Sequence, residues 1–264
     1  MLRHRILTAV IGLPLLVAII WFGEPWFTIL IAAMAVLGSW EFYRMTRQSN
    51  IQPITYFGMV WVLLFVINPH CPYRLTAPFL ITSAIVIPLI WLLFRSPREQ
   101  AFANWVWTMA AILYIGWMLS YWVELRSLEA GKELVFWAMF TTFASDTSAF
   151  FVGRAWGKHA LAPSISAGKT WEGAIGGLLA SIVISLILGI IFLLPFSYWQ
   201  IALLGCIISL FAQFGDLVES LLKRNAGVKD AGNLMPGHGG ILDRLDSLIF
   251  TGVIVYYCVV LATL

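Results

Sequence analysis

The polar residues of greatest chemical interest lie in two segments, and the longer one spans residues 215–246. Four residues near its start follow one another at helical spacing and so share one face of a helix: Asp216, Glu219, Ser220 and Lys223. That face would offer carboxylates, a hydroxyl and an ammonium to one ligand. Ordinary solvated charges on a helix at a lipid–water interface are the alternative interpretation.

The second half of this segment is rich in glycine and ends in two more carboxylates. Lys229 and Asp230 lead into several glycines, whose missing β-carbons let backbone N–H groups approach an anion closely. Asp243 and Asp246 follow at a spacing of about one helical turn, which suits Mg²⁺ because this ion takes one or two carboxylates and shares its other positions with water and substrate phosphates. A helix cap at Asp243 and a simple interfacial charge at Asp246 are the alternatives. For His238, phosphate binding, proton transfer and a loop hydrogen bond all stay open.

The shorter segment, residues 145–172, begins with an isolated carboxylate. Asp146 lies in otherwise apolar sequence, which marks it as a functional candidate. A predicted phosphate cradle follows, built from backbone N–H groups, a helix N-terminus and an ammonium, at Ser166, Gly168, Lys169 and Thr170. For Lys169, anchoring at the interface is the alternative. The Gly-Lys-Thr run is not a P-loop, because Pro163 stands where that motif needs Gly and no soluble strand precedes it.

The elements that must hold these residues are membrane helices. Of the 264 residues, 61% are hydrophobic and 11% are charged, whereas soluble domains average roughly 45–50% and about 25%. Apolar runs of about 15–22 residues can cross a hydrocarbon core of about 30 Å. We therefore predict an all-α, polytopic membrane protein of about nine transmembrane helices, near residues 6–22, 26–40, 55–68, 76–94, 105–123, 134–152, 173–194, 198–214 and 247–264.

Basic residues predict the orientation, because Lys and Arg gather in cytoplasmic loops. With the N-terminus inside, all of them fall in inner segments except Arg74, Arg126 and Lys132. Residues 153–172 and 215–246 then form two polar loops on the cytoplasmic side, and an odd number of spans puts the C-terminus outside. The net charge of +3 is too small to indicate nucleic acid as a partner.

We expect one integral-membrane domain over residues 1–264, with N-terminal spans in 1–132 and a catalytic region in 133–264. Many spans also suit a transporter. Against a transporter, the ionisable residues cluster in the two polar loops instead of at mid-membrane, and no inverted repeat is apparent.

The two polar segments resemble the phosphatidate cytidylyltransferase (CDP-diacylglycerol synthase) family. The sequence matches the family signature at Ser220, Lys223, Arg224, Lys229, Asp230, Gly232, Pro236, His238, Gly239, Gly240, Asp243, Arg244 and Asp246. Residues 146–172 and the layout of spans are also similar. Two departures are visible: Met235 stands where Ile or Leu is usual, and Ala167-Gly168 precede Lys169 where Ser-Pro is commoner. The second puts the local shape around Lys169 in question.

The resemblance implies that the CMP moiety of CTP is transferred to phosphatidate, with release of pyrophosphate. It also implies Mg²⁺, with a monovalent cation such as K⁺ beside it, and Asp216, Asp243 and Asp246 are the expected ligands. The expected location is a bacterial cytoplasmic membrane, with the active site on its inner side and the lipid bilayer as a partner. The oligomeric state is left open, with a homodimer as one option.

The residue assignments follow from both lines of reasoning. The predicted catalytic residues are Asp216, Lys223, Lys229, Asp243 and Asp246. The predicted substrate-binding residues are Asp146, Arg154, Ser166, Lys169, Thr170, Glu219, Ser220, Arg224, Asp230, His238, Gly239, Gly240 and Arg244; the basic ones would hold the triphosphate or the lipid phosphate. The alternatives are a polyprenyl-phosphate sugar-phosphate transferase and a CDP-alcohol phosphatidyltransferase, whose Asp-Gly-x-x-Ala-Arg run the sequence lacks.

Overall fold

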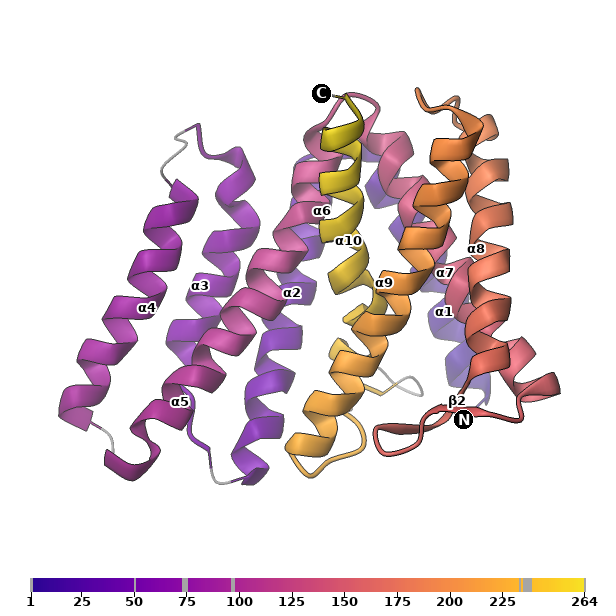
Figure 1. Cartoon of the computed structure of the whole chain (residues 1–264). Helices are drawn as coiled ribbons and strands as arrows, with labels where there is room; N and C mark the ends of the chain where they lie inside the picture. The colour runs from indigo at the N-terminus through magenta and orange to yellow at the C-terminus, as the bar shows by residue number, and fades with distance from the viewer. Residues whose placement is uncertain are drawn as a thin grey trace. The chain divides into compact units, whose positions relative to one another are not determined.

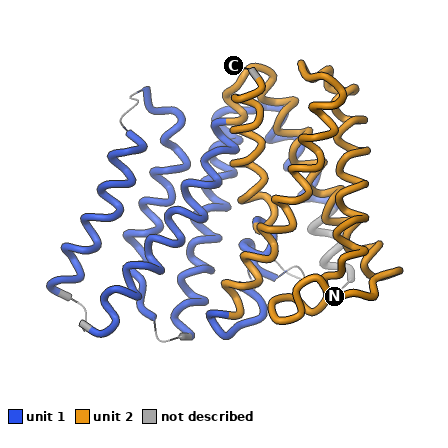
Figure 2. Tube along the Cα trace, viewed as in Figure 1, with its two compact units in different colours: residues 1–124, 225–245 blue, residues 125–224, 246–264 orange. Residues whose placement is uncertain are grey.

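A computed structural model of the chain describes residues 2–49, 51–72, 76–95, 98–232, 234 and 239–263. The chain forms two compact units (Figure 2), of which one comprises residues 1–124 and 225–245 and the other residues 125–224 and 246–264. We call them unit 1 and unit 2. The expected division near residue 132 lies close to the end of the first stretch of unit 1, but residues 225–245 group with the N-terminal helices.

Unit 1 is a bundle of apolar helices (Figure 1). Its elements are α1 (Leu2–Phe22), α2 (Trp26–Thr46), η1 (Arg47–Ser49), α3 (Thr55–Ile67), η2 (Asn68–His70), α4 (Thr76–Arg95), α5 (Arg98–Ala111), the π-helical segment η3 (Ile112–Trp117) and most of α6 (Met118–Ser127). Phe27, Phe42 and Phe65 are fully buried in its core. The buried hydroxyl of Tyr43 donates to the Thr108 carbonyl at 3.0 Å, which ties α2 to α5.

Unit 2 contains long helices and one small hairpin (Figure 1). Its elements are α7 (Gly131–Trp156), β1 (Ala160–Ala162), β2 (Ser166–Thr170), α8 (Trp171–Ile191), α9 (Tyr198–Asn225) and most of α10 (Leu242–Thr263). Glycines let α8 lie directly on α7: a β-carbon at Gly176 would come within 2.7 Å of Val152, and one at Gly177 within 2.9 Å of the Ser145 carbonyl. Small residues at such a contact are typical of helices packed in membranes.

Buried serines join the helices of unit 2. The hydroxyls of Ser145 on α7 and Ser209 on α9 are 2.8 Å apart, and Ser181 on α8 donates to the Gly205 carbonyl on α9 at 2.7 Å. A hydroxyl in an apolar interior needs such a partner, because an unpaired one carries the full cost of desolvation. These bonds fix the relative positions of the helices that hold the site described below.

The prediction of an all-α, multi-pass membrane protein is confirmed. Among the described residues, seven helices are long and apolar enough to cross a bilayer, and they occupy 26–46, 76–94, 99–127, 131–156, 171–191, 198–225 and 242–262. Two shorter apolar helices, Val10–Phe22 and Thr55–His70, coincide with the first and third predicted spans. The predicted count of nine is therefore not confirmed by helix length.

Parts of both polar segments form regular secondary structure. Residues 215–225 continue α9 without a break, because Leu217, Val218, Leu221 and Leu222 extend its apolar face and no proline interrupts it. Residues 166–170 form strand β2, which pairs antiparallel with β1, and α8 begins only at Trp171. The predicted phosphate cradle thus lies on a strand that leads into a helix and not on the helix itself.

Candidate active site

A cavity of about 420 Å³ in unit 2 collects polar side chains from α7, β2 and α9. Five predicted site residues line it: Asp146, Arg154, Lys169, Thr170 and Asp216. Apolar side chains, including Ala149, Phe150 and Leu161, complete the wall. A concave site with a few convergent charged groups in an apolar wall is the usual form of a small-molecule site.

Two of the charged side chains that line this pocket form an ion pair. The ammonium of Lys169 lies 2.6 Å from a carboxylate oxygen of Asp216, with side-chain exposures of 21% and 35%. Lys169 belongs to β2 and Asp216 to α9, so the pair joins the hairpin to the helix bundle. A phosphate that enters the pocket would meet an ammonium already held in place.

A hydroxyl connects two more carboxylates of unit 2. The Oγ hydroxyl of Ser247 donates to Asp146 at 2.7 Å and lies 3.3 Å from Oδ1 of Asp246. The backbone N–H of Ser247 donates to this same Asp246 oxygen at 2.8 Å. The carboxylate of Asp216 repels those of both Asp146 and Asp246. Three carboxylates from α7, α9 and α10 therefore contribute negative charge around the pocket, which favours a cation or a protonated group there.

The hairpin is braced at its entrance and at its tip. The Glu172 carboxylate accepts the backbone N–H of Lys158 and of His159 and pairs with the His159 ring at 2.6 Å. At the tip, Arg224 donates from its Nε to the Ile165 carbonyl at 3.3 Å.

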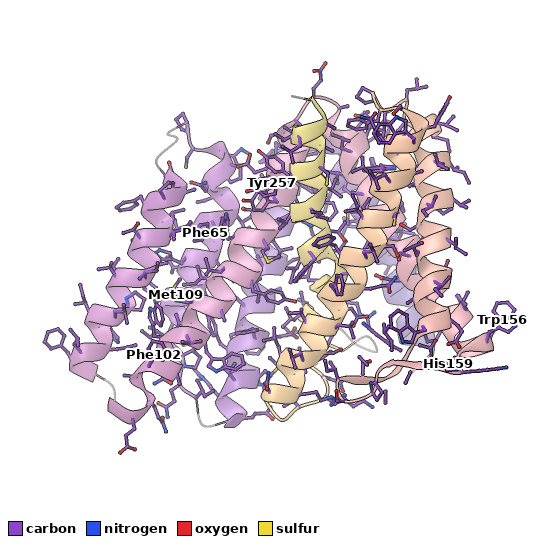
Figure 3. The ribbon with its side chains drawn as sticks, in the orientation of Figure 1. Phe65, Phe102, Met109, Trp156, His159 and Tyr257 are labelled. Carbon is purple, nitrogen blue, oxygen red and sulfur yellow. The ribbon has the colours of Figure 1, made fainter. Side chains whose placement is uncertain are left out.

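Trp156, at the end of α7, projects away from the helices of unit 2 and is 68% exposed (Figure 3). Such an aromatic ring is typical of a membrane interface.

Other predicted residues of unit 2 have structural contacts. The Thr170 hydroxyl accepts the Gly173 N–H at 3.1 Å and so caps α8. Glu219 is buried, with 1% of its side chain exposed, and pairs with Lys223 at 2.5 Å. Ser166 and Ser220 are half-buried and are not among the residues that line the cavity. The roles predicted for these five residues in substrate binding and catalysis stay predictions.

In unit 1, the glycine-rich segment folds back onto the start of α10. Both oxygens of Asp243 accept the Ala231 N–H, at 3.2 and 3.4 Å, and one of them accepts the Gly240 N–H at 2.9 Å. Gly239 has a φ of +88°, a conformation that strongly favours glycine. The side chains of Lys229, Asp230 and Arg244 are exposed. His238 lies outside the described residues.

The donor set around the pocket fits a hard cation. Within the described parts of the chain, no three His, Cys, Asp or Glu side chains already form a metal centre. Mg²⁺ does not need one, because one or two carboxylates suffice when water and substrate phosphates complete its octahedron. The mutual repulsion of Asp146, Asp216 and Asp246 is a physical reason for a cation in this pocket.

Three residues of interest were not singled out by the sequence analysis. Gln213 lines the pocket and donates to the Ala174 carbonyl and the Ser209 hydroxyl. Ser247 bridges the two carboxylates, and Glu41 is fully buried on α2. Only Glu41 carried a usable signal, since an acidic residue beside an apolar span is a functional candidate by the reasoning applied to Asp146.

Comparisons with known proteins show the family of the chain. Residues 3–262 match the cytidylyltransferase family. The chain belongs to this family. It is 34% identical over 266 residues to the phosphatidate cytidylyltransferase of Bacillus subtilis, with 98% of each chain covered. It is also 34% identical over 288 residues to the phosphatidate cytidylyltransferase of a Synechocystis species, with 98% of this chain and 96% of the relative covered.

A plant relative extends the comparison. The chain is 36% identical over 289 residues to the chloroplastic phosphatidate cytidylyltransferase 4 of Arabidopsis thaliana, with 97% of this chain and 72% of the relative covered. The family match includes residues of both units. The resemblance to the phosphatidate cytidylyltransferases is confirmed.

Proposed function

We propose that this chain transfers the CMP moiety of CTP to phosphatidate, giving CDP-diacylglycerol and pyrophosphate for phospholipid biosynthesis. The observation that carries the proposal is the pocket of unit 2, which Lys169 and Arg154 line together with the carboxylates of Asp146 and Asp216 in a member of the cytidylyltransferase family. Cations for phosphates and carboxylates for a metal ion are the groups that nucleotidyl transfer needs.

The reaction is a substitution at phosphorus. A phosphate oxygen of phosphatidate attacks the α-phosphorus of CTP, a new P–O bond forms, and the bond from the α-phosphorus to the bridging oxygen of the β-phosphate breaks. The electron pair leaves with pyrophosphate. The nucleophile is already an anion, so the chain needs no strong base. Its task is to bring two anionic substrates together and to offset their charge.

The residues divide this task by charge. Lys169, held by Asp216, and Arg154, at the end of α7, offset the negative charge of the phosphates and orient them. Asp216 and Asp246 would hold Mg²⁺, with Asp146 linked to Asp246 through Ser247. When bound, this ion supplies further charge neutralisation at the transferring phosphoryl group. Asp243, three residues before Asp246 on α10, stays a predicted third ligand, and a monovalent cation stays an expectation from the resemblance.

The proposed orientation places both polar segments in the cytosol, where CTP is available. The support is the charge pattern, because only Arg74, Arg126 and Lys132 lie in segments assigned to the outside. Phosphatidate would then be used in the inner leaflet.

The deciding experiment is a direct assay of the purified protein. CTP labelled at the α-phosphate, Mg²⁺ and phosphatidate in mixed micelles should give a labelled liponucleotide and an equal amount of pyrophosphate. Omitting phosphatidate, or labelling CTP at the γ-phosphate, should give no labelled lipid. Uptake of CTP into proteoliposomes without lipid product would favour the transporter alternative.

A further inference from the structure

The described residues of the glycine-rich segment of unit 1 contact a buried carboxyl group of the protein itself. Glu41, on α2, has no exposed surface. One of its oxygens accepts the N–H of Leu242, the first residue of α10, at 3.0 Å. The backbone N–H groups of Leu234 and Ile241 interact favourably with the same carboxylate. Backbone N–H groups beside the glycines of this segment thus interact with a buried glutamate side chain.

Two glycines make this approach feasible. A β-carbon at Gly232 would come within 2.2 Å of Glu41 Oε1, and one at Gly240 within 2.6 Å of Glu41 Oε2. Neither distance is compatible with a real side chain. The carboxylate and the backbone of this segment therefore fit each other closely, and the fit depends on the absence of both β-carbons.

A second carboxylate, that of Asp243 at the start of α10, also accepts hydrogen bonds from the backbone of this segment. Asp243 accepts the N–H groups of Ala231 and Gly240, so Glu41 and Asp243 between them engage both ends of the stretch 231–242. That stretch follows Lys229 and Asp230 directly and contains Gly239, all predicted site residues. Burying a charge is expensive, and an apolar residue of similar size is often as stable or more stable. A buried glutamate that binds only loop backbone is better explained by conformation than by stability.

We propose that Glu41 is a positioning residue for the transfer reaction. Its carboxyl group holds the backbone at Leu242 and lies against Gly232 and Gly240, and it thereby sets the positions of Lys229, Asp230 and Asp243 for the triphosphate of CTP. This inference rests on the proposed function. It adds a residue from α2, near the N-terminus, to a set of site residues that otherwise lie in the C-terminal half of the sequence.

The test approaches the contact from both sides. Glu41→Gln removes the charge at nearly constant size, and Gly232→Ala pushes a methyl group against the carboxylate. The double variant Gly232→Ala/Glu41→Asp shortens the acidic side chain by one methylene and so makes room for the new methyl group at position 232. Tyr43→Phe is the matched control, because it removes another buried hydrogen bond of α2 that goes to α5 and not to the glycine-rich segment. With the wild type and the single variants Gly232→Ala and Glu41→Asp, the double variant completes a double-mutant cycle.

Two measurements are made on each detergent-purified variant. Hydrogen exchange followed by mass spectrometry reports the order of residues 226–242 without any need for activity, so it stands even if the proposed function fails. Steady-state kinetics with CTP and phosphatidate micelles separate KM from kcat. Loss of correctly folded protein lowers only the apparent kcat, whereas a displaced segment also raises the KM for CTP.

We expect faster exchange in residues 226–242 and a KM for CTP raised about tenfold or more in Glu41→Gln and Gly232→Ala, as fits the loss of charge-assisted hydrogen bonds. The double variant should recover part of both effects, and Tyr43→Phe should show neither. A wild-type KM for CTP in both single variants overturns the proposal, whether or not exchange changes. Failure of the double variant to recover either quantity also overturns it, and this arm remains informative if Glu41→Gln does not fold.

Discussion

The ammonium of Lys169 and the carboxylate of Asp216 form a 2.6 Å ion pair that connects strand β2 to helix α9 inside the pocket of unit 2. The two residues are far apart in the sequence, since Lys169 belongs to the shorter polar segment and Asp216 to the longer one. The pair shows what the hairpin contributes to the site, because β2 places the ammonium of Lys169 beside the carboxylate of Asp216. It also explains how a lysine on a short strand keeps a defined position before substrate arrives.

Replacing Lys169 by Ala should therefore reduce the stabilisation of the transition state more than the stability of the fold. We expect a loss of about 1–3 kcal/mol in kcat/KM for CTP or phosphatidate, because a charge-assisted bond to phosphate disappears. Lys132→Ala is the control, since that lysine also forms an ion pair in unit 2, with Glu133, but does not line the pocket. Unchanged kinetics for Lys169→Ala would return this residue to the role of an interface anchor.

Ser247→Ala should impair the reaction although serine supplies no charge. Its hydroxyl lies between Asp146 and Asp246, and without it the half-buried Asp146 loses a hydrogen bond at 2.7 Å. We expect about a tenfold lower kcat, the equivalent of roughly one such bond. Thr251→Val, one turn further along α10, removes a buried hydroxyl that donates to a helix carbonyl and should leave kcat close to wild type. Equal effects of the two substitutions would contradict a specific role for Ser247.

Thr170 separates two roles that the sequence could not distinguish. As the cap of α8, its hydroxyl satisfies the Gly173 N–H, so Thr170→Val should lower stability by about 0.5–2 kcal/mol while Thr170→Ser preserves it. Thermal unfolding in detergent with a fluorescence readout measures this difference. If Thr170→Val instead keeps its stability and raises the KM for CTP, the hydroxyl binds substrate, as first predicted.

The sequence was most informative where the signal is local. Hydropathy predicted the helices, and the lone Asp146 pointed to the pocket, because a charge in an apolar span is costly wherever the span packs. The spacing of polar residues along 215–225 also indicated a helix correctly. Strands β1 and β2 escaped prediction because they have only three and five residues, too few for an alternating pattern to stand out.

Contacts between remote segments could not be predicted in this way. The bond from Leu242 to Glu41 joins positions 201 residues apart, and no local pattern identifies which backbone a buried carboxylate will meet. The same holds for Ser247, whose partner Asp146 lies 101 residues earlier. The glycines at 232 and 240 indicated close approach to an anion, but the sequence could not say that the anion was a side chain of α2.

The orientation of the chain has a direct test with cysteine probes. In a background without Cys71, Cys206 and Cys258, a cysteine at the exposed position Asn225 should be protected from an impermeant thiol reagent in intact cells, whereas one at the exposed Glu129 should react. The reason is the concentration of basic residues in the segments assigned to the inside. Labelling of Asn225→Cys from outside, without cell lysis, would reverse the topology and remove the active site from the cytosol.

Asp246 and Asp243 provide the sharpest test of the metal proposal, because the structure gives them different surroundings. Asp246 is linked through Ser247 to Asp146 beside the pocket, whereas both oxygens of Asp243 accept backbone N–H groups of the glycine-rich segment. Asp246→Asn keeps the size of the side chain and removes its charge. If Asp246 holds Mg²⁺, this variant should insert and purify normally yet lose activity by orders of magnitude, since charge neutralisation at the transferring phosphoryl group is the main catalytic contribution.

Asp243→Asn then decides between two roles for its carboxylate. As a metal ligand it should behave like Asp246→Asn, with weaker binding of Mn²⁺ and CTP in a titration followed by electron paramagnetic resonance. As a brace for the loop it should keep Mn²⁺ binding and show a raised KM for CTP, because Asn retains only one acceptor oxygen and presents an amide N–H group where the second oxygen of Asp243 accepts the Ala231 N–H. Since Asn caps a helix about as well as Asp, capping alone predicts near wild-type turnover. Wild-type activity and Mn²⁺ affinity in both Asn variants, across a full Mg²⁺ titration, would end the metal proposal at these two positions.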